Sequence, residues 1–174
     1  MVFFYCGKCN GTKKIERCKT YKKMKILIIA IGKARGAETA FVDEYKKRLD
    51  NSVSIQELVY TKNLPPEEQK KAEGALILKA IPKSSVIILL DEQGKNMTSR
   101  GFADNIQKWQ NLGTRNLVFI IGGAFGVCDE VKEKADETIA FGKWTWPHKL
   151  VRIMVMEQIY RATQILSGHP YHKE

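Results

Sequence analysis

The sequence predicts a three-layer α/β sandwich built on a mostly parallel sheet. Three near-continuous apolar runs, at residues 25–31, 85–91 and 117–123, are typical of strands that are buried on both faces. Segments with apolar residues at helical spacing alternate with these runs along the chain. Because parallel strands need a crossover connection that is usually a helix, this alternation favours helices on both faces of one sheet.

The remaining elements follow the first strand in a regular order. After the strand at 25–31 we expect a helix at 37–49, a strand at 53–59, a helix at 67–80, a strand at 85–91, a helix at 98–110, a strand at 117–123, a helix at 128–136, a strand at 138–141 and a helix at 149–167. The run at 53–59 alternates apolar and polar residues, which indicates one wetter face. Thr98 or Ser99 can cap the helix that begins there.

Apolar residues at helical spacing predict which face of each long helix is buried. These residues are Ala40, Phe41, Tyr45 and Leu49; Ala72, Ala75, Leu76 and Leu78; Phe102, Ile106 and Trp109; and Val151, Met154, Val155, Ile159, Ala162, Ile165 and Leu166. The last stripe is broader than contact with one sheet face requires, so an isologous contact between two copies would bury the surplus.

Length and composition indicate one globular domain. The chain has 174 residues, 44% of them hydrophobic and 28% charged, which is ordinary for a soluble protein. No apolar run approaches the length that spans a bilayer, and the opening M-V-F-F-Y-C is too short for a signal-peptide core. We therefore expect a cytoplasmic protein with no membrane partner.

The net charge of +10 is unevenly distributed. Residues 1–23 hold seven basic side chains and one acid, which leaves 22 basic and 18 acidic residues in 24–174. The main domain is only mildly basic and does not by itself require a polyanion. An RNA role of this domain must rest on local placement of cations, such as Lys143, His148, Lys149, Arg152 and Arg161.

The first 23 residues read as an extension outside the domain. They contain Cys6, Cys9 and Cys18, and C-G-K-C has the spacing of half a zinc knuckle, although a fourth ligand is missing. Met24 followed by K-I-L-I-I-A-I looks like the start of a domain, so we interpret 1–23 as non-native or disordered and 24–174 as the domain. We expect no metal site.

Three glycine-containing loops follow strands and mark the expected site. They are residues 91–96, 122–126 and 142–148, and ligands of open α/β sheets bind beyond the carboxyl ends of the strands. None has the G-x-G-x-x-G or G-K-[ST] pattern, so a phosphate cradle is not supported. Trp144 and Trp146 can wall an adenine, but such residues are also common core or dimer contacts.

The C-terminal region is dense in residues that carry chemistry. Trp144, Trp146 and His148 precede the last helix, and His169, Tyr171 and His172 follow it. Most chain ends are polar and frayed, and a merely structural end needs no such cluster. We therefore expect this end of the chain to be used in function.

Residues 24–174 resemble the RlmH family of ribosomal RNA large-subunit methyltransferases, which belong to the SPOUT class. The resemblance rests on M-K-I-L-I-I-A-I-G-K at the start, F-I-I-G-G-x-x-G, P-H-x-L-V-R, E-Q-I-Y-R-A and the ending G-H-P-Y-H-K-E. Lys173 stands where relatives commonly have arginine, which keeps the charge but loses the planar fork.

The resemblance implies a homodimer that acts on ribosomes, with 23S ribosomal RNA and neither DNA nor membrane as partner. It implies methyl transfer from S-adenosylmethionine to ring nitrogen 3 of a pseudouridine, and a C-terminal trefoil knot that forms the cofactor site. Matching positions place the cofactor against Leu90, Gly122, Phe141, Gly142, Lys143, Trp144, Thr145 and Trp146.

Methyl transfer from a sulfonium is an in-line displacement that needs aligned reactants and no metal. The acceptor nitrogen carries a proton, so a base helps; His172 is the first candidate and His148 the second. Arg152, Arg161 and Lys173 are candidates for holding phosphates or the anionic ring.

Two alternatives remain open at this point. One is a non-catalytic RNA- or ribosome-binding module, which the basic segment 1–23 favours slightly. The other is a flavodoxin-like signalling domain that accepts a phosphoryl group on Asp91, although Ile31-Gly32-Lys33-Ala34 stands where its acidic pair would be. The sequence also leaves open whether the C-terminal residues act within one chain or across a dimer.

Overall fold

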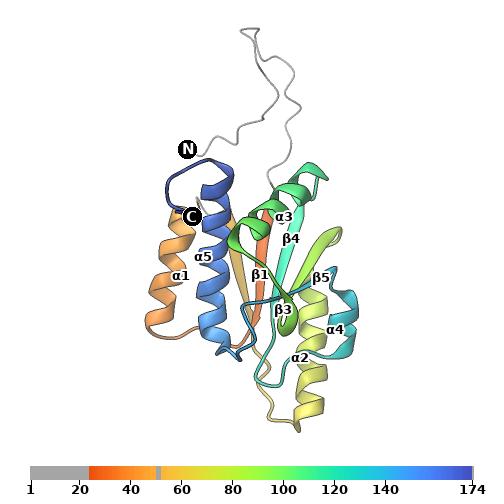
Figure 1. The fold of residues 1–174 in the computed structure, drawn as a ribbon. Coiled ribbons are helices and arrows are strands. Elements are labelled where there is room, and N and C mark those ends of the chain that lie inside the picture. Colours follow the sequence, from red (N-terminus) through yellow and green to blue (C-terminus); the bar gives the residue numbers. More distant parts are fainter. Residues whose placement is uncertain (1–23, 50–51, 174) are drawn as a thin grey trace, which may run out of the picture.

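The structure, a computed structural model, describes residues 24–49 and 52–173. Its centre is a five-stranded sheet in the order β2-β1-β4-β3-β5, with every pair parallel (Figure 1). The strands are β1 (Lys25–Ile31), β2 (Val53–Leu58), β3 (Ser85–Asn96), β4 (Asn116–Ile121) and β5 (Glu137–Ala140). The expected α/β class and parallel sheet are confirmed, whereas the expectations for residues 1–23 lie outside the described residues.

Helices cover both faces of the sheet and complete three layers. They are α1 (Ala37–Arg48), α2 (Pro66–Ala80), α3 (Ser99–Asn111), α4 (Asp129–Lys134) and α5 (His148–Leu166). α5 packs between α1 and α3 on one face, and α2 and α4 lie together on the other (Figure 1). No helix in the described ranges is long and apolar enough to cross a bilayer.

Successive residues of a strand point to opposite faces of the sheet and join two separate hydrophobic cores. In β1, Ile26, Ile28 and Ala30 join the core under α1, α3 and α5, while Ile29 and Ile31 join the core under α2 and α4. This division explains the unbroken apolar runs, because both faces of the central strands are covered. Burial against two helical layers fixes the position of the carboxyl ends of β1, β3 and β4.

Local signals explain where some helices begin and which face they bury. Thr98 caps α3, since its Oγ1 accepts a hydrogen bond of 3.1 Å from the amide of Gly101. The expected residues Phe102, Ile106 and Trp109 are buried in α3, as are Val155, Ile159 and Ala162 in α5.

The expected buried faces of α1 and α2 were wrong in part. In α1, Val42 is buried and Phe41 is 52% exposed. In α2, the buried residues are Glu73, Gly74 and Ile77, whereas Leu78 is exposed. The reason in α2 is close packing on α4, because a Cβ at Gly74 would overlap the thiol of Cys128. α2 therefore turns its glycine, rather than its alanines, toward α4.

The expected loop at 91–96 is a continuation of β3. The strand pairs with β5 through Leu90, breaks register, and pairs again from Lys95. The intervening residues bulge out of the ladder at the carboxyl edge of the sheet. β4 ends at Ile121, so Gly122 and Gly123 leave the sheet earlier than expected.

Candidate functional site

A cleft of about 430 Å³ lies at the carboxyl edge of the sheet, where the bulge of β3, the turn after β4 and the loop after β5 meet. Its volume is in the range of small-ligand and cofactor sites. Seven of the eight residues expected to hold a cofactor line it: Leu90, Gly122, Phe141, Gly142, Trp144, Thr145 and Trp146. Lys143 is exposed and does not line the cleft. The structure thus gathers residues from three distant segments around one hollow.

The loop that joins β5 to α5, residues 141–147, is fastened to itself and to β3. The indole N–H of Trp146 donates to the carbonyl of Phe141 (2.9 Å). The amide of Gly142 donates to Asn96 Oδ1 (2.9 Å), and Thr145 Oγ1 donates to Glu92 Oε2 (2.6 Å). These contacts hold the loop in shape as one wall of the cleft.

Residues 122–126 form a tight glycine turn at the opposite wall. The amide of Gly126 donates to the carbonyl of Gly123 (3.1 Å), and Gly126 has φ of 78°, a conformation that favours glycine. A Cβ at Gly123 would overlap Oε2 of the buried Glu73. A side chain at 123 would therefore require the Glu73 carboxylate of α2 to move.

Aromatic rings stand at the edge of the cleft. The centroids of Trp144 and Trp146 are 5.9 Å apart with an interplanar angle of 31°. Trp144 is 74% exposed and Phe125, on the glycine turn, is 50% exposed. Such exposed rings offer flat apolar surfaces for a heterocycle or a partner surface.

His148 also lines the cleft, at the first residue of α5. Burial lowers the pKa of its imidazole, and the positive charges of Arg152 and Lys149 lower it further. The ring is therefore neutral at pH 7, which leaves one nitrogen free to accept a proton or a hydrogen bond.

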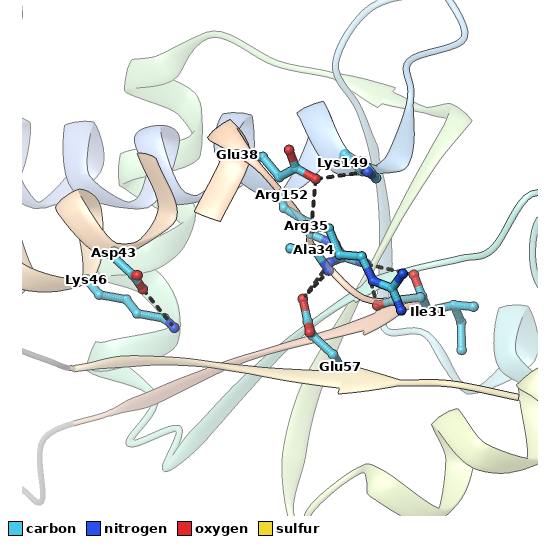
Figure 2. Close-up of polar contacts among 10 residues, drawn as sticks. Ile31, Ala34, Arg35, Glu38, Asp43, Lys46, Glu57, Lys149 and Arg152 are labelled. Atoms are coloured by element: carbon cyan, nitrogen blue, oxygen red, sulfur yellow. Dashed lines mark hydrogen bonds and ion pairs between the residues drawn. The ribbon is translucent and has the colours of Figure 1, made fainter. Parts of the chain in front are cut away.

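Arg152 lies one turn further along α5 and is only 1% exposed. Its guanidinium donates to Glu57 Oε1 (2.7 Å), to the carbonyl of Ile31 (2.7 Å) and to the carbonyl of Gly32 (2.8 Å) (Figure 2). An RNA phosphate has no access to this buried group, so the placement differs from the phosphate contact that the sequence suggested. Arg152 instead joins α5 to the ends of β1 and β2.

The C-terminal tail, residues 167–173, lies far from the cleft of its own chain. Tyr171 donates from its hydroxyl to Glu157 Oε1 (3.2 Å), and His172 Nδ1 lies 3.3 Å from Arg161 Nη1. At 1.5 Å per residue, Arg161 is about 20 Å along α5 from His148. His172 and the exposed Lys173 are therefore not brought to the site that His148 lines.

The tail is held against α5 by packed rings and one shared carboxylate. The ring of Tyr171 meets that of Tyr160 edge-on at 4.9 Å, and the guanidinium of Arg161 lies 4.9 Å from the ring centroid of Tyr171. Burial and the charge of Glu157 raise the pKa of Tyr171 to about 12. Tyr171 thus stays protonated and serves as a donor that anchors the tail.

Sequence reasoning missed residues whose partners lie far away along the chain. Glu57 and Glu73 were read as parts of a strand and a helix, with no role assigned. Only the polarity of Arg152 among apolar neighbours indicated that this side chain needs acceptors elsewhere in the chain. Asp91 and Glu92 lie in one of the three segments that the sequence placed at the site, and both line the cleft, although Glu92 had no role assigned and Asp91 only that of a phosphoryl acceptor.

Comparison with known proteins gives a match over nearly the whole described chain. A family model described as "Predicted SPOUT methyltransferase" matches residues 24–172. A protein of Rhodospirillum centenum called "Ribosomal RNA large subunit methyltransferase H" is 42% identical over 151 residues, covering 86% of this chain and 99% of its own length. A protein of the same description from Ruegeria sp. is 41% identical over 155 residues, with the same coverage.

One solved structure resembles this chain only remotely. It is the SpoU methyltransferase AviRb from Streptomyces viridochromogenes in complex with AdoMet, with a TM-score of 0.44 and 10% sequence identity. The likeness covers 85% of this chain and 61% of the other.

Proposed function

The chain belongs to the SPOUT methyltransferase family, and from this premise we propose that it methylates ring nitrogen 3 of a pseudouridine in 23S ribosomal RNA. S-adenosylmethionine is the methyl donor of this family. The relatives named as ribosomal RNA large-subunit methyltransferases support the substrate class, because they align over 99% of their own length. The choice of nucleotide rests on the closing motifs, from P-H-x-L-V-R to G-H-P-Y-H-K-E. The site of action would be the ribosome in the cytoplasm.

The observation that carries the proposal is the cleft at the carboxyl edge of the sheet. Its glycine turns allow backbone to approach a flat ligand, and Phe141 and Trp146 offer apolar walls. Asp91 and Glu92 line the same hollow and suit a ligand with a positive centre. These features fit a molecule with an adenine ring and a sulfonium.

The donor supplies a methyl group on a positive sulfur, which needs no metal for activation. The chain must then align the acceptor ring and remove its N–H proton as the carbon–nitrogen bond forms. The neutral imidazole of His148, which lines the cleft, is suited to accept that proton. His172 remains a second candidate base if the tail reaches a cleft.

We place the tail at the cleft of a second subunit. His172 is held about 20 Å along α5 from His148, so a tail that keeps its contacts with α5 cannot reach its own cleft. Exposed apolar residues on this side of the molecule, Phe41 of α1 and Leu150 of α5, favour a two-fold contact. In this arrangement Lys173 would lie where the RNA backbone enters.

The trefoil knot expected of the family remains part of the proposal. The chain leaves β5 at the sheet edge, passes the end of β3 through contacts to Asn96 and Glu92, and reaches α5 between α1 and α3. A C-terminal segment threaded through a loop would close the cleft around the donor.

Two measurements test the proposed function. Titration calorimetry should show saturable binding of S-adenosylmethionine, and a Leu90→Trp variant, which fills the cleft, should lose it while circular dichroism remains unchanged. Mass mapping of 23S ribosomal RNA from cells that lack the protein should show one pseudouridine without its methyl group, restored by the wild-type gene and not by the variant. Absence of saturable binding would favour a non-catalytic RNA-binding module instead.

A further inference from the structure

The loop between β1 and α1, residues 32–36, lies beside the cleft without lining it. A Cβ on Gly32 would be 3.9 Å from Nε2 of His148, and His148 is itself part of the cleft wall. The loop therefore borders the cleft at a distance of one side chain. Neither the expected cofactor residues nor the expected catalytic residues include any part of it.

A carboxylate on β2 fixes the middle of this loop. Glu57 Oε1 accepts hydrogen bonds from the amide of Ala34 (2.7 Å) and from Arg152 Nη1 (2.7 Å). Arg152 also donates to the carbonyls of Ile31 and Gly32, where the loop leaves β1 (Figure 2). Because the guanidinium is buried, its bonds to the carbonyls of Ile31 and Gly32 are largely shielded from water and hold the start of the loop in place.

A second carboxylate fixes the end of the loop. Glu38 Oε1 accepts from the amide of Arg35 (3.0 Å) and from Lys149 Nζ of α5 (3.0 Å) (Figure 2). The amide of Arg35 and the ammonium of Lys149 lower the pKa of Glu38 to about 2. Both nearby acids, Glu57 and Glu38, are thus occupied by partners that tie the loop to β2 and α5.

Two cations on the loop remain without a counter-charge. Lys33 and Arg35 are exposed, and within residues 24–49 and 52–173 neither side chain has an ion-pair partner. Isolated surface cations are common and carry no function by themselves. Here the loop backbone that carries them is bonded to Glu57 and to Glu38. Both of these acids are paired with a cation of α5, and the loop lies next to His148 in the cleft wall.

We propose that residues 32–36 form a basic rim on which Lys33 and Arg35 bind backbone phosphates of the ribosomal RNA next to the nucleotide that enters the cleft. This inference rests on the proposed function, since it assumes an RNA substrate. Phosphate contacts position a nucleic acid without reading its sequence, and a rigid rim holds the strand in register at a small entropic cost.

The test compares two double variants that remove the same charge. Lys33→Ala with Arg35→Ala removes both rim cations, whereas Lys71→Ala with Lys79→Ala removes two exposed cations of α2 on the other face of the sheet. Binding to protein-free 23S ribosomal RNA and to ribosomes is measured at several salt concentrations. Calorimetry with S-adenosylmethionine and methyl transfer to ribosomes are measured in parallel.

The rim variant should bind both RNA probes roughly tenfold more weakly at low salt, with the slope of log K against log salt reduced by about 2. Its affinity for S-adenosylmethionine should match that of wild type, and its KM for ribosomes should rise. The α2 variant should behave like wild type in every assay.

Equal RNA affinities and salt slopes for the two double variants would contradict the proposal that Lys33 and Arg35 bind RNA phosphates. A loss confined to ribosomes, with protein-free RNA bound normally, would also overturn it, because it would assign the loop to a ribosomal protein. Failure of the proposed function gives a different result, because the wild-type protein would then leave ribosomes unmethylated. The RNA-binding assays would still show whether Lys33 and Arg35 contact the RNA.

Discussion

Arg152 illustrates how much one residue contributes to the organisation of this fold. Its side chain, 1% exposed, is bonded to one carboxylate and two main-chain carbonyls. A buried arginine needs partners for its charge, and here the bonds made by its two terminal nitrogens join the ends of β1, β2 and α5. The same bonds hold the start of the loop that carries Lys33 and Arg35.

Arg152→Met should therefore destabilise the protein strongly. The change leaves two carbonyls and the partly exposed Glu57 without the guanidinium, and each buried polar group left unsatisfied costs about 1–3 kcal/mol of unfolding free energy. Lys46→Met, which breaks the exposed pair with Asp43 (Figure 2), should cost about 0–1 kcal/mol. Urea unfolding followed by circular dichroism measures both, and equal losses would contradict the role given to Arg152.

At the scale of elements, α5 begins with an arrangement that disfavours positive charge on His148. Lys149 and Arg152 lie in the first two turns of α5, close to His148. The positive end of the helix dipole also lies there and likewise disfavours a protonated imidazole. Burial adds the largest effect, and Glu73 acts weakly in the opposite direction. A histidine at this helix start is thus kept neutral.

The pKa of His148 should consequently lie below its usual value of 6.5. The folded state then binds this proton less readily than the unfolded chain, so stability is fully present above pH 6.5 and decreases as the pH falls toward the folded pKa. An NMR titration measures the pKa directly, and Lys149→Met should raise it while Lys47→Met should not. If His148 is the base, the rate of methyl transfer should follow the same titration. A pKa at or above 6.5 would contradict this account.

Several elements are encoded locally, and others depend on their neighbours. α3 shows the first case, because a threonine cap and four buried apolar residues at helical spacing agree. α2 shows the second case. The spacing of its alanines and Leu78 predicted one buried face, but the contact of Gly74 with α4 buries a different one. The continuation of β3 to Asn96 also depends on a partner, since β5 supplies the second set of ladder contacts.

At the scale of the whole molecule, the cleft and the tail are at different positions along α5. The tail is anchored by Tyr171, Glu157 and Arg161, and the cleft begins at His148. One chain can therefore combine both only through a second copy, which makes the proposed dimer a condition for any catalytic role of His172.

Mixing two inactive variants tests this arrangement. Leu90→Trp blocks the cleft and leaves the tail intact, whereas His172→Ala impairs the tail and leaves the cleft intact. If the tail acts in its partner's cleft, refolding the two together should restore about a quarter of wild-type methyl transfer, because half the dimers then hold one complete site. Analytical ultracentrifugation of the mixture should show a dimer, as the proposal requires. No recovery from such a mixture would show that the tail does not act in its partner's cleft, and full activity of His172→Ala alone would remove His172 from the mechanism.

The sequence by itself determined the order of strands and helices along the chain, the parallel sheet and the edge of the sheet at which the cleft lies. Apolar periodicity is a local property, and the carboxyl ends of parallel strands necessarily meet, so loops at 91–96, 122–126 and 142–148 could be assigned to one edge. The cofactor positions came from resemblance, and the structure gathers most of them around one cleft.

Only the tertiary structure decided that Arg152 is buried against Glu57, that α2 turns Gly74 toward α4, and that the tail lies away from the cleft of its own chain. Each of these facts joins residues that are distant in the chain; Arg152 and Glu57 are 95 positions apart. Such pairs form because a buried charge or a close helix contact must find its complement somewhere in the fold, and no local pattern states where that complement is.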